Sequence, residues 1–184
     1  LKALRLTDQL AQQVVRFKVL ARAHFGLKQK DDLIALRDEI EPRVAEAEEK
    51  KKKQSDQARE KAKKEKKNKK DTDKMVKDAT KGVDGDLKQL RPLKEEITVY
   101  LELLDGAKLD DDKAKKIKRS KSALALLHLE YGEAGKAGEL AAEAVKESEK
   151  RTVPLAVQVH VLEQSGKKDE AAGAFAKLQE ISTH

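Results

Sequence analysis

The stretch that decides the fold lies near the C-terminus, where one short pattern occurs twice. It reads Tyr-Gly-Glu-Ala-Gly-Lys-Ala at residues 131–137 and Ser-Gly-Lys-Lys-Asp-Glu-Ala at residues 165–171. The matching positions are 34 residues apart: Gly132 and Gly166, Ala137 and Ala171, and Ala141 and Phe175. A glycine that precedes a run of alanines and larger apolar residues is typical of a turn between two helices. We therefore expect two copies of one helix–turn–helix unit.

The period of 34 residues and the small residues resemble the tetratricopeptide repeat (TPR). In that family a glycine makes the turn, small residues let the two helices approach closely, and an aromatic residue of the second helix packs back on the first. The family positions are occupied in the last unit by Leu155, Gly166, Ala171 and Phe175, and in the preceding unit by Ala125, Gly132, Ala137 and Ala144, with Ala141 in place of the aromatic residue. The resemblance covers residues 121–184.

The resemblance is weaker over residues 10–45 and does not extend to residues 46–118. The alignment of this first unit places His24 at the position of His128. The turn of the unit then has the sequence Gly-Leu-Lys-Gln-Lys, at residues 26–30. A repeat array usually needs three or more units for a continuous core. We therefore expect about four helix pairs, of which the second is irregular.

Apolar residues at steps of three and four predict two helices in the N-terminal part. The first ends at Gly26, and the second starts at Asp31, whose carboxylate suits a first helical turn. The second helix is expected to continue past Pro42. It is expected to weaken over residues 66–73, because the charged segment has almost no apolar face.

The C-terminal half predicts further helices. Glycines predict a turn at residues 82–85, and an amphipathic helix follows over residues 90–104. One long helix is predicted over residues 110–131, with a basic first half and an apolar second half. Pro154 suits the first turn of a later helix, for which Thr152 is the candidate N-cap.

These patterns predict an all-α protein, a TPR-like helix–turn–helix solenoid with a long charged, coiled-coil-like helical insertion. We divide it into a degenerate TPR-like helix pair (1–45), a charged Lys-rich helical extension or linker (46–85), and helical repeats that include the two TPR-like units (86–184). Aromatic residues make up 3% of the chain and tryptophan is absent. Large aromatic side chains usually supply much of a compact core, so their scarcity favours a thin structure packed with alanine and leucine.

Composition also limits the chemistry and the environment. The chain of 184 residues has no cysteine, which removes disulfides, thiolate metal sites and cysteine nucleophiles. It has no apolar run of membrane-spanning length, so no span is expected. Because it starts Leu-Lys without methionine, we expect a piece of a larger chain or assembly. Its compartment stays open between the cytoplasm and export after removal of an N-terminal signal.

The positive charge is concentrated in one segment. Residues 50–70 contain twelve lysines or arginines and three acids, a net charge of +9, whereas the whole chain has +7. Such a run is either a solvated spacer or a surface for nucleic acid or another anionic partner. Only one arginine and no aromatic residue lie in it, which favours the spacer. The candidates for an anionic partner are Lys50, Lys51, Lys52, Lys53, Lys63, Lys64, Lys66, Lys67, Lys69 and Lys70.

The sequence predicts no catalytic, metal or cofactor site. His24 and His128 have no second ligand at zinc-like spacing, and their shared repeat position favours a common packing role. Gly132, Gly135 and Gly138 recur every three residues, which differs from a phosphate-binding glycine loop. No Ser–His–Asp set stands in a familiar context, so we expect no enzyme.

The TPR resemblance therefore implies a non-catalytic protein–protein interaction or scaffold module. Such repeats display a groove to a helix or an extended peptide of a partner protein. The alternative is nucleic-acid or anionic-surface binding through residues 50–70. The candidate groove residues are Arg16, Arg22, Lys121, Gln158 and His160.

Overall fold

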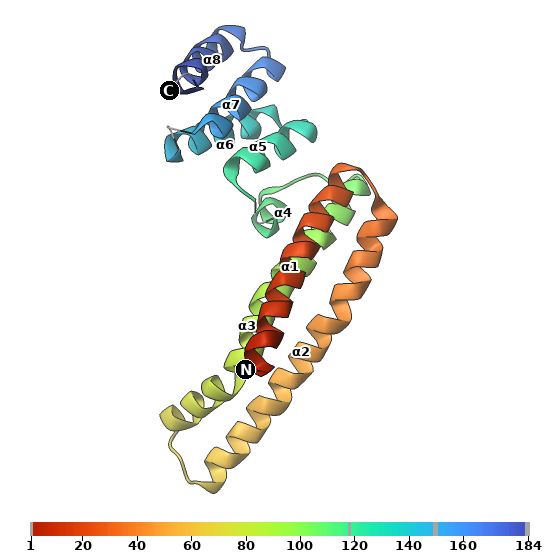
Figure 1. Cartoon of the computed structure of the whole chain (residues 1–184), viewed down its shortest axis with the longest axis vertical. Helices are drawn as coiled ribbons and strands as arrows, with labels where there is room; N and C mark the ends of the chain where they lie inside the picture. The colour runs from red at the N-terminus through yellow and green to blue at the C-terminus, as the bar shows by residue number, and fades with distance from the viewer. Residues whose placement is uncertain (1, 118, 149–150, 183–184) are drawn as a thin grey trace. The chain divides into compact units, whose positions relative to one another are not determined.

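The computed structural model describes residues 2–117, 119–148 and 151–182, with side chains from Leu10 onward. Within this part the chain is all-α, as predicted: it forms eight helices and no strand (Figure 1). The helices belong to two compact units. Unit 1 extends to Ala107 and unit 2 begins at Lys108.

Unit 1 consists of a long helical hairpin and a shorter helix that packs on it. Helices α2 (Lys30–Lys64) and α3 (Lys69–Leu104) lie antiparallel, and α1 (Lys2–Gly26) contacts both (Figure 1). Helix α1 lies along the half of the hairpin that is next to the α1–α2 turn. The other half, which ends in the α2–α3 loop, extends beyond α1.

The core of unit 1 is built from the apolar faces that the sequence predicts. The α1 face buries Val14, Phe17, Ala21 and Phe25, and the α2 face buries Leu33, Leu36, Ile40 and Val44. Helix α3 adds a longer apolar face between Val83 and Leu103. The rings of Phe25 and Tyr100 stack with 4.3 Å between their centroids, which joins α1 to α3.

The turn predicted at residues 82–85 is wrong, because α3 passes through both glycines without interruption. Val83 and Leu87 are buried in the hairpin, and the Thr80 hydroxyl donates to the Asp84 carboxylate at 2.8 Å. A glycine inside a helix costs about 1 kcal/mol relative to alanine. Packing of α3 along the length of α2 offsets that cost.

The α2–α3 connection is a short loop, whereas a gradual weakening was expected over residues 66–73. Helix α2 ends at Lys64, and Lys66 has a positive φ of 50°. Asn68 then caps α3, because its side chain accepts a hydrogen bond of 2.9 Å from the Asp71 N–H. The lysine-rich segment is therefore helical on both sides of a defined loop.

Helix α2 continues past Pro42, as predicted. The domain boundaries predicted after residues 45 and 85 fall inside α2 and α3 respectively. The two compact units separate after Ala107. The three-part division itself stays a prediction.

Unit 2 is built from five shorter helices: α4 (Asp111–Lys116), α5 (Lys121–Glu130), α6 (Ala134–Glu147), α7 (Thr152–Gln164) and α8 (Lys168–Ser182). Helix α5 packs on α6 and α7, and α7 packs on α6 and α8.

Two predictions for unit 2 are wrong. The single helix expected over residues 110–131 is broken, because Ile117 has an extended backbone and a buried side chain, and Ser120 then caps α5 by accepting from the Ala123 N–H. Burial of the isoleucine and the cap together outweigh helix continuation. At α7 the N-cap is Arg151 rather than Thr152.

The core of unit 2 combines large buried side chains, such as Ile117 and Leu155, with one cluster of mostly small residues. Ala125, Ala137, Ala141 and Val161 form one cluster, in which each residue is at most 1% exposed. Phe175 was expected to pack against its partner helix, but its exposed fraction is 48%. The reason is that α8 buries its alanines on the face toward the core, and Phe175 follows on the outer side.

Candidate functional site

The turns inside the two helix pairs of unit 2 have the same hydrogen bonds. Gly132 and Gly166 have φ of 80° and 75°, the left-handed conformation that favours glycine. Each glycine N–H donates to the carbonyl three residues earlier, and the next N–H donates to the carbonyl five residues before itself. The following helix begins with a matching bond of 3.0 Å, from Ala137 to Glu133 in one pair and from Ala171 to Lys167 in the other.

The α1–α2 turn of unit 1 has the same set of bonds where the alignment places it. Lys28 takes the position of the glycine with φ of 56°, and Leu33 makes the matching bond to Gln29 at 3.2 Å. The connections after α2 and α3, at Lys66 and Gly106, also have the first two of these bonds. The helix that follows each of them, however, starts farther along the chain than in the three turns. The agreement among the three turns therefore goes beyond an ordinary helix end.

The two aligned histidines also have equivalent contacts. Nδ1 of His128 lies 2.7 Å from a Glu133 carboxylate oxygen, and Nδ1 of His24 lies 2.8 Å from the Gln29 side-chain oxygen. Each contact links the end of a helix to the third and last residue of its turn, which is the N-cap of the next helix. Within the described ranges no group of three or more metal-ligating side chains converges.

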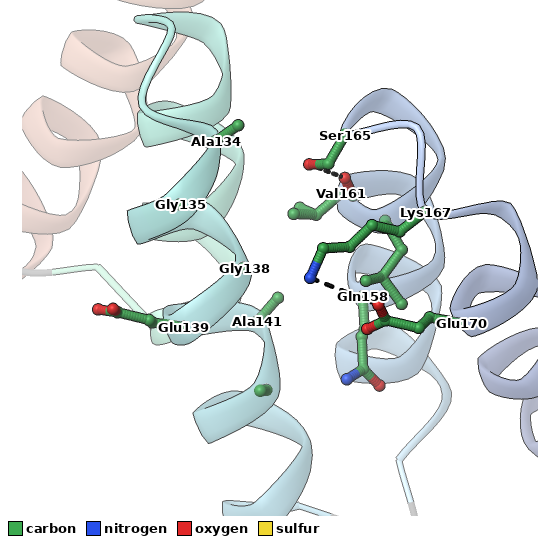
Figure 2. A pocket seen from close by; sticks show the side chains of 12 residues that line it. Ala134, Gly135, Gly138, Glu139, Ala141, Gln158, Val161, Ser165, Lys167 and Glu170 are labelled. Atoms are coloured by element: carbon green, nitrogen blue, oxygen red, sulfur yellow. Dashed lines mark hydrogen bonds and ion pairs between the residues drawn. The ribbon is translucent and has the colours of Figure 1, made fainter.

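A groove of about 450 Å³ lies between α6, α7 and the first turn of α8 (Figure 2). Its floor is apolar, with Ala141 and Val161 as buried members. Gly135 and Gly138 line the α6 side, and a Cβ atom at either position would meet no atom within 4 Å. Alanine in a helix interior is more stable than glycine by about 0.5–1 kcal/mol. The open space therefore comes at a cost in helix stability.

Polar groups form the rim of this groove. Gln158, Lys167 and Glu170 stand on the side of α7 and α8, and the Lys167 side chain extends toward α6 (Figure 2). The Lys167 ammonium lies 3.4 Å from the Glu170 carboxylate. Glu139 of α6 is the remaining charged lining residue. The Glu139 carboxylate points away from α7 and α8, so that Lys167 and Glu170 are the charged groups that face the groove (Figure 2).

Only one of the five predicted groove residues, Gln158, lines this groove. His160 is exposed on α7, and Lys121 lies at the start of α5. Arg16 and Arg22 belong to α1 of unit 1. The structure therefore does not bring the five together within either unit, and their role toward a partner stays a prediction.

Lys121 is held by two acids of the neighbouring helix. Its ammonium lies 2.6 Å from Glu143 and 2.7 Å from Glu147. The hydrogen bonds to Glu143 and Glu147 raise the pKa of Lys121, and the bond from Lys121 lowers the pKa of Glu143. This lysine therefore connects α5 to α6.

Arg22 takes part in a buried polar cluster that the sequence analysis missed. Its Nε donates to Glu96 at 3.0 Å, and the Tyr100 hydroxyl donates to the same oxygen at 2.6 Å. Glu96 is only 1% exposed. Burial lowers the pKa of Arg22, but the hydrogen bond and the charge of Glu96 raise it more, so that the pKa lies above its ordinary value. A signal was present, because Glu96 falls between Leu93 and Tyr100 on the apolar face of α3.

The ten predicted anion-binding lysines surround the end of the hairpin, on the last half of α2, the loop and the first turn of α3. Three of them lie near acids: Lys51 at 2.7 Å from Asp84, Lys53 at 2.6 Å from Glu49, and Lys67 at 3.8 Å from Glu65. The other seven form no ion pair with any described residue.

No protein-family model matches the chain, and no curated protein or solved structure matches it either. None of the described helices combines the length and hydropathy that crossing a bilayer requires.

Proposed function

We propose that unit 2 is a non-catalytic protein-binding module of the TPR type. In this proposal the pairs α5–α6 and α7–α8 are two repeats of a short solenoid. The equal turns at Gly132 and Gly166, and the buried alanines that follow each of them, support this assignment. The groove between α6, α7 and α8 would hold a helix or an extended peptide of a partner protein.

The observation that carries this proposal is the open apolar groove between two closely packed helix pairs. Ligand grooves combine an apolar floor with a few polar groups that fix orientation. Here Ala141 and Val161 supply the floor, and Gln158 can both donate and accept hydrogen bonds. An apolar side chain of the partner would lie over the two glycines of α6, where an added Cβ atom meets nothing within 4 Å.

The charges at the rim favour a basic residue beside that apolar anchor. Lys167 pairs with Glu170 at the rim of the free protein, and the carboxylate of Glu139 points from α6 away from α7 and α8 (Figure 2). Lys136 approaches Glu139 from outside at 3.7 Å, where both side chains are exposed. Such exposed pairs contribute about 0–1 kcal/mol, so a cation of a partner can replace Lys136.

Gly138→Leu tests the groove directly. The new side chain extends into the open space and occupies the place of the apolar anchor, while helix propensity improves. Random peptides displayed on phage are selected on the full chain, and their affinities are then measured by fluorescence anisotropy. We expect Gly138→Leu to weaken the selected peptides at least tenfold.

Gly173→Leu is the matched control, because Gly173 is an exposed glycine of α8 that does not line the groove. It should leave the affinities unchanged, and the selected peptides should share an apolar residue next to a basic one. Peptides that bind Gly138→Leu as tightly as the unchanged protein would overturn the proposal. A selection that yields no binding peptide would also count against it.

A further inference from the structure

The outer face of α3 carries a regular row of lysines. Lys70, Lys74, Lys77, Lys81 and Lys88 follow one another at steps of four, three, four and seven, so they lie on one side of the helix. All five are exposed. We call this row the lysine stripe. At 1.5 Å per residue it is about 27 Å long.

The lysine stripe is not neutralised by the chain. None of its five ammonium groups forms an ion pair with a described residue. Other lysines of unit 1 are paired, for example Lys94 with Glu41 at 2.5 Å. Asp73, Asp78 and Asp84 each lie three or four residues from stripe lysines. Asp84 is engaged by Lys51 at 2.7 Å and by Thr80, and the exposed Asp73 and Asp78 form no ion pair with a described residue. The stripe therefore presents free positive charges at fixed spacing on a packed helix.

We propose that the lysine stripe binds the phosphate backbone of double-stranded nucleic acid without sequence readout. This function is separate from the one proposed for unit 2. Lysines that neutralise phosphates release condensed counterions, which drives binding. The stripe length corresponds to about eight base pairs at 3.4 Å per pair. The lysines around the α2–α3 loop, which begins one turn before Lys70, extend the positive surface at one end.

The composition of this surface argues against a protein partner. Protein interfaces are centred on apolar, aromatic and arginine side chains and are depleted in lysine. Residues 49–73 include no side chain that is both larger and more apolar than that of alanine. Met75 and Val76 follow, but both are partly buried toward α2. A surface on which lysines outnumber acids and large apolar side chains are absent suits a dense polyanion.

The distribution of aromatic residues favours a duplex over a single strand. Single strands are usually held by aromatic rings on which the bases stack. Between Phe25 and Tyr100 the chain has no aromatic residue, and these two rings are buried against each other. Membrane binding by a surface helix usually requires an apolar face as well, which the outer side of this hairpin lacks.

The test measures binding of the full chain to a random-sequence DNA duplex by fluorescence anisotropy over a range of salt concentrations. Five phosphate contacts predict a slope of log K against log salt of about −4.5, which corresponds to about a 500-fold loss between 50 and 200 mM salt. Changing the five stripe lysines to glutamine should reduce the steepness of that slope by about 4.5 and weaken binding more than tenfold at low salt.

The matched control changes five exposed, unpaired lysines of unit 2 to glutamine: Lys108, Lys116, Lys146, Lys168 and Lys177. Both variants lose five charges, so equal losses of affinity would show a net-charge effect and overturn the proposal. It would also be overturned by tighter binding to a single strand, or by tighter, stripe-dependent binding to phosphatidylserine vesicles. Circular dichroism checks that each variant keeps its helix content, which glutamine favours.

Discussion

Arg22→Ala should lower the free energy of unfolding of unit 1 by about 3 kcal/mol. The change removes the cation that lies 3.0 Å from Glu96, a carboxylate that is only 1% exposed. A buried charge left without its partner typically costs about 3–5 kcal/mol. We use the lower end of this range because the Arg22 side chain is 39% exposed, so water can approach after its removal.

Urea unfolding measures this effect. In a Tyr131→Phe background Tyr100 is the only tyrosine, so its fluorescence reports on unit 1 alone. Arg16→Ala is the matched control, because Arg16 is an exposed arginine of the same helix, and it should change stability by less than about 0.5 kcal/mol.

A second variant separates charge from packing. Glu96→Gln in the Arg22→Met background leaves no buried charge, keeps an acceptor for the Tyr100 hydroxyl and retains most of the arginine stem. We expect this pair to recover most of the lost stability. If Arg22→Ala destabilises no more than Arg16→Ala, the buried carboxylate does not depend on Arg22.

Phe25→Ala should destabilise unit 1 by about 3–5 kcal/mol, the usual cost of removing a buried aromatic side chain. Phe25 is 6% exposed and stacks on Tyr100, so the change leaves a cavity and removes an aromatic pair between α1 and α3. The same urea experiment, followed by circular dichroism, measures the loss.

Phe175→Ala gives the comparison, because that ring is 48% exposed on α8. It should cost less than about 1 kcal/mol, since little apolar area is lost from the interior. The TPR resemblance assigns Phe175 a packing role, so an equal or larger effect at Phe175 would contradict the structure and support the sequence-based expectation.

The elements that sequence predicts best are those with a continuous apolar face. The helix that buries Val14 to Phe25 and the one that buries Leu33 to Ile40 are confirmed, because burial every three or four residues has a direct signature in sequence. The small residues Ala137 and Ala171 are also buried as expected.

The failures have a common physical cause. Glycines at residues 82–85 indicate a turn locally, but contacts with α2, which is distant in sequence, keep α3 helical. Ile117 has good helix neighbours, yet its burial in an extended conformation breaks the helix expected over residues 110–131. Tertiary contacts decided both cases, and a single sequence does not show them.

The candidate site was predicted only in part. Gln158 was named and lines the groove, while Gly135 and Gly138 were considered only as a phosphate loop. A missing side chain gives no chemical signal in sequence, so a groove made by glycines becomes visible only when neighbouring helices are placed around it.

Hydrogen exchange of the full chain, with and without a peptide selected on it, tests the central claim most directly. If the peptide lies in the proposed groove, amide protection should increase over residues 134–142 and 158–170 and stay unchanged throughout unit 1. Protection confined to unit 1, or to the start of α5, would contradict the assignment of the groove as the binding site.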